Sequence, residues 1–126
     1  MIKTKKEKNN ERSAVYNLGS RTFDCPIELT STAINGKWKL LIIYRLSLQH
    51  KLRFSQLKKE VKGVSEKMLI QHLKEMEKDG LVDRIVYPVV PPKVEYGLTE
   101  AGRSFIPVLD MMRNWGLSFI AVEATT

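Results

Sequence analysis

The feature that most constrains the fold is a pair of short amphipathic segments separated by only three residues, "KGV" at positions 62–64. In the first segment, residues 55–61, Leu57 and Val61 are four residues apart and so share one face of a helix. In the second segment, residues 65–79, apolar side chains recur at spacings of one, three and four residues behind a serine that can cap a helix. So short a connection between two helices is typical of a helix-turn-helix.

The segment after this pair has the pattern of two strands joined by a stiff turn. Apolar and polar residues alternate in 81–87 and again in 93–99, with prolines between them. We predict a β-hairpin whose tip, the wing at residues 87–94, is stiffened by proline and charged at Lys93. A helix-turn-helix followed by such a hairpin has the arrangement of a winged helix, and its second helix is the one that enters the major groove of DNA.

Helices are expected on both sides of this unit. Pro26 suits the first position of a helix in "CPIELTSTAIN", and we expect Gly36 to end it. Residues 37–49 are apolar nearly all round, which predicts the central buried helix. Thr99 is expected to cap a long final helix, in which Pro107 either introduces a kink or marks a late first turn. The predicted class is α+β, mostly α.

The final helix holds more apolar side chains than one face can bury. Eight of them lie between Val108 and Ile120. A helix that is apolar on more than one face needs a second surface to cover it. We therefore predict that the additional C-terminal helix, together with the N-terminal one, forms the interface of a homodimer. A two-fold dimer would read an inverted-repeat operator with half-sites about one or two helical turns apart.

Positive charge is concentrated in the middle of the chain. The 126 residues carry a net charge of +7. Residues 36–99 contain thirteen basic and seven acidic side chains, whereas residues 100–126 contain two basic and three acidic ones. This excess favours a polyanionic partner, either nucleic acid or an anionic membrane surface. We expect residues 1–20 to form a flexible basic tail and residues 21–126 to form one domain.

Several stretches of the chain together resemble one known family. "GKW", "SEKMLIQHLKEME", "DGLV", "YPVVPPKVEYGLTEAGRS" and the closing "NWG" are similar to the HxlR-type winged helix-turn-helix regulators of the MarR-like superfamily. The resemblance extends from residue 25 to about residue 119. It implies a dimeric bacterial transcription regulator. It also implies that Cys25 stands where some members sense electrophiles or oxidants, just before the first helix.

The predicted DNA contacts lie on the second helix of the pair, at the start of the first, and on the hairpin. Gln71 can pair with adenine through two hydrogen bonds, and Lys67 can reach a guanine edge or a phosphate. A helix N-terminus such as that near Ser55 presents free N–H groups to phosphate. The predicted DNA-binding residues are Ser55, Gln56, Ser65, Lys67, Met68, Gln71, Lys74, Arg84 and Lys93.

Cys25 is the only cysteine, so no disulfide can form within the chain. It lies at the start of a helix, where the positive end of the dipole stabilises a thiolate, whereas the nearby carboxylates of Asp24 and Glu28 oppose this. Two interpretations remain open: a small apolar residue packed beside the helix, and a redox- or electrophile-sensing thiol. A sensing thiol would form an intersubunit Cys25–Cys25 bond, a mixed disulfide or an electrophile adduct.

No sequence pattern indicates catalysis or a bound metal. The chain lacks a phosphate-binding glycine loop and a nucleophile elbow, and one cysteine and two histidines at unrelated spacing do not make a zinc site. We expect no enzyme activity and no cofactor. The charged N-terminus lacks the apolar stretch of a signal peptide, and no run approaches the roughly 18 apolar residues of a membrane span. We therefore expect a cytoplasmic protein without a membrane partner.

Two functions fit this fold, because a fold does not dictate a function. One is a homodimeric, sequence-specific transcriptional regulator that binds double-stranded DNA with recognition helix 65–79 and wing 87–94. The alternative is a winged-helix module for protein–protein contact, which would present an exposed apolar patch on the same face. Polar and basic residues at these positions favour DNA binding. A small-molecule effector is possible, but the sequence does not identify one.

Overall fold

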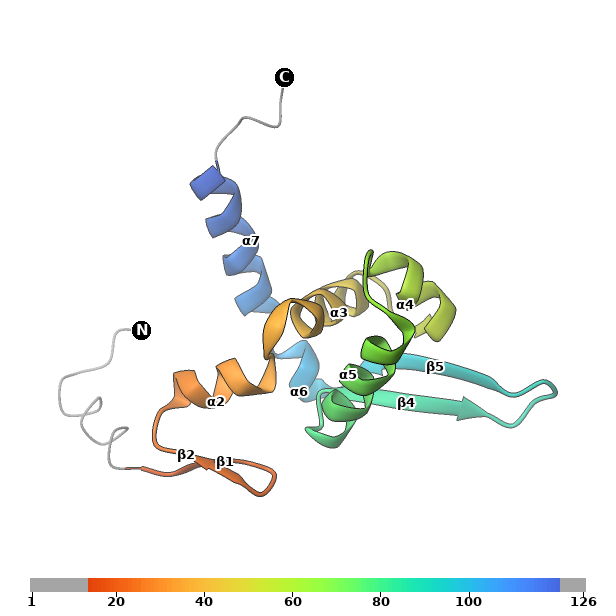
Figure 1. Cartoon of the computed structure of the whole chain (residues 1–126), viewed down its shortest axis with the longest axis horizontal. Coiled ribbons are helices and arrows are strands. Elements are labelled where there is room, and N and C mark those ends of the chain that lie inside the picture. Colours follow the sequence, from red (N-terminus) through yellow and green to blue (C-terminus); the bar gives the residue numbers. More distant parts are fainter. Residues whose placement is uncertain (1–13, 121–126) are drawn as a thin grey trace.

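The computed structural model describes residues 14–120 and shows a winged-helix body from which three parts project (Figure 1). The long hairpin leaves the body on one side, the N-terminal elements on the opposite side, and the final helix projects in a third direction. The body consists of α3 (Gly36–Leu48), β3 (Leu52–Arg53), α4 (Phe54–Glu60), α5 (Glu66–Lys78), β4 (Val82–Tyr87) and β5 (Lys93–Leu98). The predicted α+β winged-helix class is confirmed.

The turn between α4 and α5 is held by two buried valines and a glycine. Val61 and Val64 are 1% and 2% exposed, so both ends of the turn are anchored in the core. Gly63 adopts a φ of +94°, a left-handed conformation that favours glycine. The predicted helix-turn-helix is confirmed, although α4 begins at Phe54, with Arg53 rather than Ser55 at its N-cap.

The sheet has β5 at its centre, between β3 and β4. β4 pairs with β5 in antiparallel register from Val82 opposite Leu98 to Tyr87 opposite Lys93. β3 adds a short edge by pairing Leu52 with Tyr96. Residues 88–92 form the tip of this hairpin, which extends far from the helices (Figure 1).

The core lies where the helices of the body meet the base of the sheet. α3 is the central helix, as its apolar composition predicted, with Ile42 and Ile43 fully buried. α5 is amphipathic and turns one face toward it. The core side chains are Ile42, Ile43, Leu46, Leu52, Leu57, Val61, Val64, Leu69, Leu73, Met76, Val82, Leu98 and Leu109.

The N-terminal elements contain a hairpin that the sequence did not predict. β1 (Tyr16–Leu18) and β2 (Arg21–Phe23) pair around a turn in which Gly19 has a φ of +62°. These strands have three residues each, too few for a clear alternating pattern. Most of the tail predicted for residues 1–20 lies outside the described residues.

The first helix ends earlier than expected. The hairpin leads into α2 (Pro26–Ala33), with Pro26 at its first position as predicted. Gly36 does not end this helix, because Ile34 is already its C-cap and Gly36 is the first residue of α3. The φ of Gly36, +80°, lets the chain turn sharply between the two helices.

The predicted long final helix is divided in two. Thr99 caps α6 (Glu100–Arg103), accepting a 3.0 Å hydrogen bond from the backbone N–H of Gly102. The helix is interrupted at residues 104–105. A second helix, α7 (Ile106–Ile120), follows, and Pro107 is its second residue. Proline thus marks a late first turn, because its missing N–H would break a helix interior but costs nothing there.

Candidate nucleic-acid interface

α5 has one face in the core and a polar face open to solvent. Leu69, Leu73 and Met76 are buried, at most 2% exposed. Ser65 caps the helix, its Oγ accepting a 3.1 Å hydrogen bond from the backbone N–H of Met68. The exposed side chains of the outward face are Glu66, Lys67, Ile70, Gln71, Lys74, Glu77 and Lys78. This face holds three lysines and two carboxylates, with Lys67 in the first turn, where a recognition helix meets base edges.

The predicted site residues on and near α5 differ in their surroundings. Lys67 and Lys74 are exposed, and no hydrogen bond or ion pair within residues 14–120 holds their ammonium groups. Gln71 is exposed, but its Nε2 donates to Glu75 Oε1 at 3.2 Å. Met68 is half-buried and packs against the core. Ser65 is exposed, and its Oγ accepts the capping bond while its own O–H can still donate. Ser65, Lys67, Gln71 and Lys74 are therefore the predicted residues here that offer polar groups to a ligand.

The N-terminus of α4 also presents polar groups. Gln56 accepts a 2.8 Å hydrogen bond from the backbone N–H of Arg53 through its Oε1, which holds the first turn of the helix. Ser55 is exposed in this turn. Ser55 and Gln56 therefore lie at the end of α4 where free N–H groups favour an anion.

The wing differs from the expectation of a charged tip. Lys93 is not at the tip but in the last residue pair of the hairpin, opposite Tyr87. Its Nζ lies 3.8 Å from Glu95 Oε2 and 4.8 Å from the ring centroid of Tyr87. The tip is apolar instead, with Val89 and Val90 51% and 100% exposed. Arg84, in β4, has an exposed side chain.

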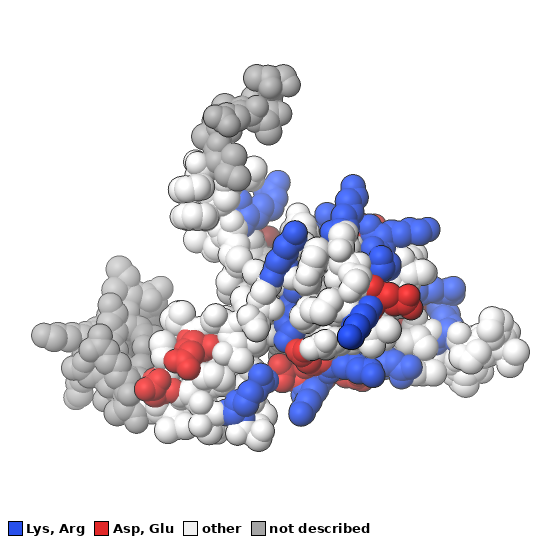
Figure 2. Space-filling model, viewed as in Figure 1, with Lys and Arg blue, Asp and Glu red and all other residues white. Residues whose placement is uncertain are grey.

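Basic side chains gather around these elements. Figure 2 shows lysines and arginines over α4, α5 and the base of the long hairpin, with acidic groups among them and an uncharged wing tip. The N-terminal elements show acidic side chains on the same view. On this face, basic side chains therefore lie over the helix-turn-helix and the start of the hairpin, both of which belong to the basic middle of the chain.

An ion pair between α3 and α5, in which the lysine is buried, was not predicted. Lys39 of α3 is 4% exposed, and its Nζ lies 3.0 Å from Glu75 Oε2. The hydrogen bond from Lys39 lowers the pKa of Glu75, and burial lowers the pKa of His72. The sequence did contain one signal for this pair. Lys39 lies between apolar residues on a helix predicted to be buried, and a buried lysine needs a carboxylate partner.

Cys25 lies away from this surface. It is the N-cap of α2, is half-buried, and makes no side-chain capping hydrogen bond. Its backbone oxygen accepts a 3.1 Å hydrogen bond from the N–H of Leu29. In Figure 1 the start of α2 and the helix pair α4–α5 lie on different sides of α3.

α7 carries an exposed apolar stripe. Met111, Trp115 and Phe119 are 69%, 65% and 72% exposed. The rings of Trp115 and Phe119 stack with their centroids 4.8 Å apart. Val108 and Met112 continue the stripe along the same helix. On α2, Ile27 is 76% exposed. Both helices predicted to form a dimer interface therefore leave apolar side chains uncovered in the single chain.

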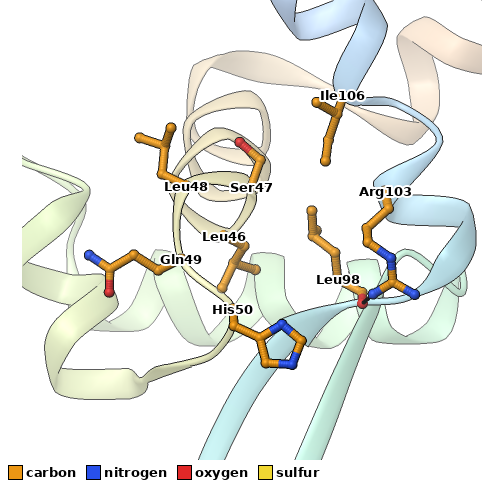
Figure 3. Close-up of a pocket in the computed structure, with 8 residues that line it drawn as sticks. All are labelled: Leu46, Ser47, Leu48, Gln49, His50, Leu98, Arg103 and Ile106. Carbon is orange, nitrogen blue, oxygen red and sulfur yellow. Dashed lines mark hydrogen bonds between the residues drawn. The ribbon is translucent and has the colours of Figure 1, made fainter.

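A separate cavity of about 220 Å³ lies where α3, β5 and α6 meet (Figure 3). Arg103 lines it but donates from Nη1 to the backbone oxygen of Leu98 at 2.8 Å. The other side chains that line the cavity are Leu46, Ser47, Leu48, Gln49, His50, Leu98 and Ile106.

Among residues 14–120 no three His, Cys, Asp or Glu side chains are grouped to hold a metal ion. No helix in this range is long and apolar enough to cross a membrane.

Comparison with known proteins agrees with this geometry. The model of the HxlR-like helix-turn-helix family matches residues 33–124. A protein of Methanothermobacter thermautotrophicus, described as an HTH-type transcriptional regulator, is 43% identical over 99 residues, which cover 79% of this chain and 75% of the relative.

Two solved structures are similar as well. The structure of the HTH-type transcriptional regulator ytcD has a TM-score of 0.70 and 47% identity, covering 75% of this chain and 96% of the other. The redox regulator HypR in its reduced form has a TM-score of 0.72 and 40% identity, covering 80% of this chain and 99% of the other. The winged-helix body, the projecting terminal helices and these matches together show that the chain belongs to the HxlR-like helix-turn-helix family of transcriptional regulators.

Proposed function

We propose that this protein is a homodimeric, sequence-specific DNA-binding regulator in which α5 lies in the major groove. The observation that carries the proposal is the outward face of α5, where Lys67, Gln71 and Lys74 are exposed. Lysine and glutamine present the donors that guanine and adenine edges accept, and the helix N-terminus suits a phosphate. The family's description as transcriptional regulators supports the same function.

In this function the hairpin acts as the wing. Its strands carry Arg84 and, next to the tip, Lys93, and in this function both side chains contact the backbone beside the groove read by α5. The exposed valines of the tip form a small apolar patch that suits the sugar edges of a groove better than a phosphate. A charge-free tip is also what the alternative protein-binding module would need, so the wing does not distinguish the two functions. The proposal of DNA binding therefore relies on the polar face of α5.

The dimer would bring two copies of α5 onto one face of the duplex. α7 and α2 expose apolar side chains that a second copy of the chain would cover. Two-fold symmetry then requires an inverted-repeat operator, with half-sites about one or two helical turns apart.

The decisive experiment is footprinting of the purified protein on a genomic DNA library, followed by affinity measurements on the protected sequence and on scrambled DNA. We expect protection of an inverted repeat and an affinity for it about 10³-fold or more above that for scrambled DNA at the same salt concentration. Equal, weak binding to both sequences would favour the protein-binding module.

A second proposal concerns regulation through Cys25. Cys25 is half-buried at the start of α2, with no capping bond to hold its side chain, and the similar protein HypR is a redox regulator. With one cysteine per chain, an oxidant gives a disulfide between subunits or with a small thiol, and an electrophile gives an adduct. An intersubunit bond requires the two Cys25 Cα atoms to lie within about 7 Å of one another.

The test measures operator affinity before and after diamide or quinone, in the wild-type protein and in Cys25→Ser. We expect the reagent to change the affinity of the wild type and to leave Cys25→Ser unchanged. Full modification of the thiol, shown by mass spectrometry, with unchanged wild-type affinity would rule out this regulation.

A further inference from the structure

Two ion pairs hold the C-terminal half of α5, and neither belongs to the DNA contacts proposed above. Arg21 of β2 donates from Nη2 to Asp79 Oδ1 at 2.7 Å, immediately after the last residue of α5. Lys39 of α3 lies 3.0 Å from Glu75, one turn earlier. The same end of the helix is therefore bound to two different elements.

Each pair joins a buried charge to a more exposed one. The side chains of Asp79 and Lys39 are 6% and 5% exposed, whereas those of their partners Arg21 and Glu75 are 46% and 40% exposed. A buried charge must keep its partner, because leaving it unpaired in a poorly hydrated site is costly. The contacts consequently permit few positions of α5 relative to β2 and α3, even though the pairs add little net stability.

The space between the hairpin β1–β2 and α5 is not filled by apolar packing. A pocket of about 340 Å³ lies between them, and its walls are Leu18, Gly19, Ser20, Arg21, Lys39, Glu75, Lys78 and Asp79. Across this gap the Arg21–Asp79 pair connects the two elements. The hairpin therefore contacts the end of α5 through a charge pair beside an open pocket.

We propose that Arg21 and Lys39 are positioning residues, which fix the orientation of α5 for operator binding through Asp79 and Glu75. This inference rests on the proposed function, because it assumes that α5 reads DNA. It assigns a role to the N-terminal hairpin: this element lies outside the winged-helix body, yet it holds one end of the recognition helix. Arg21 needs no contact with DNA in this role.

Neutralising each member of the Arg21–Asp79 pair in turn separates positioning from simple electrostatics. Loss of a positive charge weakens DNA binding by Coulombic attraction alone, and loss of a negative charge strengthens it. If the pair positions α5, both Arg21→Gln and Asp79→Asn weaken operator binding, by about 5- to 20-fold. The double variant Arg21→Gln/Asp79→Asn is then no weaker than either single variant, because the same contact is lost only once.

Affinity for scrambled DNA and thermal melting provide the controls. We expect non-specific affinity to follow charge, falling slightly in Arg21→Gln and rising slightly in Asp79→Asn, with the folded structure retained in both. Arg21→Lys, which keeps the charge, should recover part of the operator affinity. An Asp79→Asn protein that melts like the wild type and binds operator as well or better would overturn the inference. A wild-type protein without any preferred DNA sequence would instead refute the proposed function.

Discussion

Helices α5 and α7 both carry apolar side chains, but α5 buries most of its own within the chain, whereas α7 leaves most of its own exposed. Leu73 of α5 is 2% exposed, whereas Trp115 and Leu117 of α7 are 65% and 60% exposed. The apolar face of α5 packs on α3 and leaves a polar face for a ligand, while α7 projects from the body with its apolar side uncovered (Figure 1). The core of the winged-helix body is therefore covered within one chain, whereas the uncovered side of α7 supports the proposed dimer.

The strongest test of this difference is a matched pair of leucine truncations. Leu73→Ala should lower the free energy of unfolding by about 2–5 kcal/mol, because it removes buried contacts and leaves a cavity. Leu117→Ala should change it by less than about 0.5 kcal/mol in dilute protein, where dimers are absent. Urea denaturation at several protein concentrations measures both values. Similar losses at low concentration would show that α7 packs within its own chain.

The next largest effect is expected at the proposed dimer interface. Trp115→Asp places a charge in the centre of the apolar stripe and should weaken self-association by about 100-fold or more, since buried aromatic anchors carry much of an interface's energy. Unfolding of the monomer should not change. Sedimentation equilibrium gives the association constant, with Arg113→Gln as a control on the same helix. A wild-type protein that sediments only at 14.5 kDa would contradict the prediction.

On α5, the polar face should affect DNA binding and leave stability unchanged. Lys67→Ala and Gln71→Ala should each cost about 1–3 kcal/mol of operator affinity and relax sequence preference at one position. Lys93→Ala, at the wing, should weaken binding to all sequences and lower the slope of log affinity against log salt by about one. Titrations over a range of salt concentrations separate the two effects. Wild-type behaviour in all three variants would place the DNA surface elsewhere.

The smallest expected effect is the dependence of folding stability on pH, and it should arise in the winged-helix body. Burial lowers the pKa of His72 from 6.5, so the unfolded chain binds a proton more readily than the folded one just below that pH. Stability should consequently fall as the pH drops below about 6.5 and stop falling below the folded pKa. The His72→Gln variant should lack this part of the pH dependence in thermal melts, while dimerisation through α7 stays unaffected. A wild-type melting temperature that stays constant from pH 7 to pH 5 would contradict this.

The body could be predicted because its elements follow local rules. Short spacing between two amphipathic segments, a serine N-cap and alternating strands led to α4, α5 and the β4–β5 hairpin, and the structure confirms them. Ser65 caps α5 as predicted, because the capping hydrogen bond joins residues only three positions apart in the sequence. The uncovered apolar side of α7 could also be predicted, because it follows from the number of apolar residues within one segment.

What could not be predicted depends on residues far apart in the chain. Arg21 and Asp79 are separated by 58 positions, and neither has a distinctive neighbourhood in the sequence. The position of Lys93 in the hairpin depends on the register in which β4 and β5 pair. The proline-rich sequence between these strands does not fix that register. DNA contacts themselves remain predictions, since a contact is a property of the complex and not of the free protein.

The long hairpin also has a consequence for how the protein behaves at high concentration. β4 is an edge strand, and an exposed edge invites pairing with the strands of other molecules. Here Asp83 and Arg84 place opposite charges on its exposed positions, and three of the five residues 88–92 are prolines, which cannot donate a ladder hydrogen bond. The hairpin can therefore reach far into solvent with an apolar tip and still resist strand-by-strand growth into fibrils.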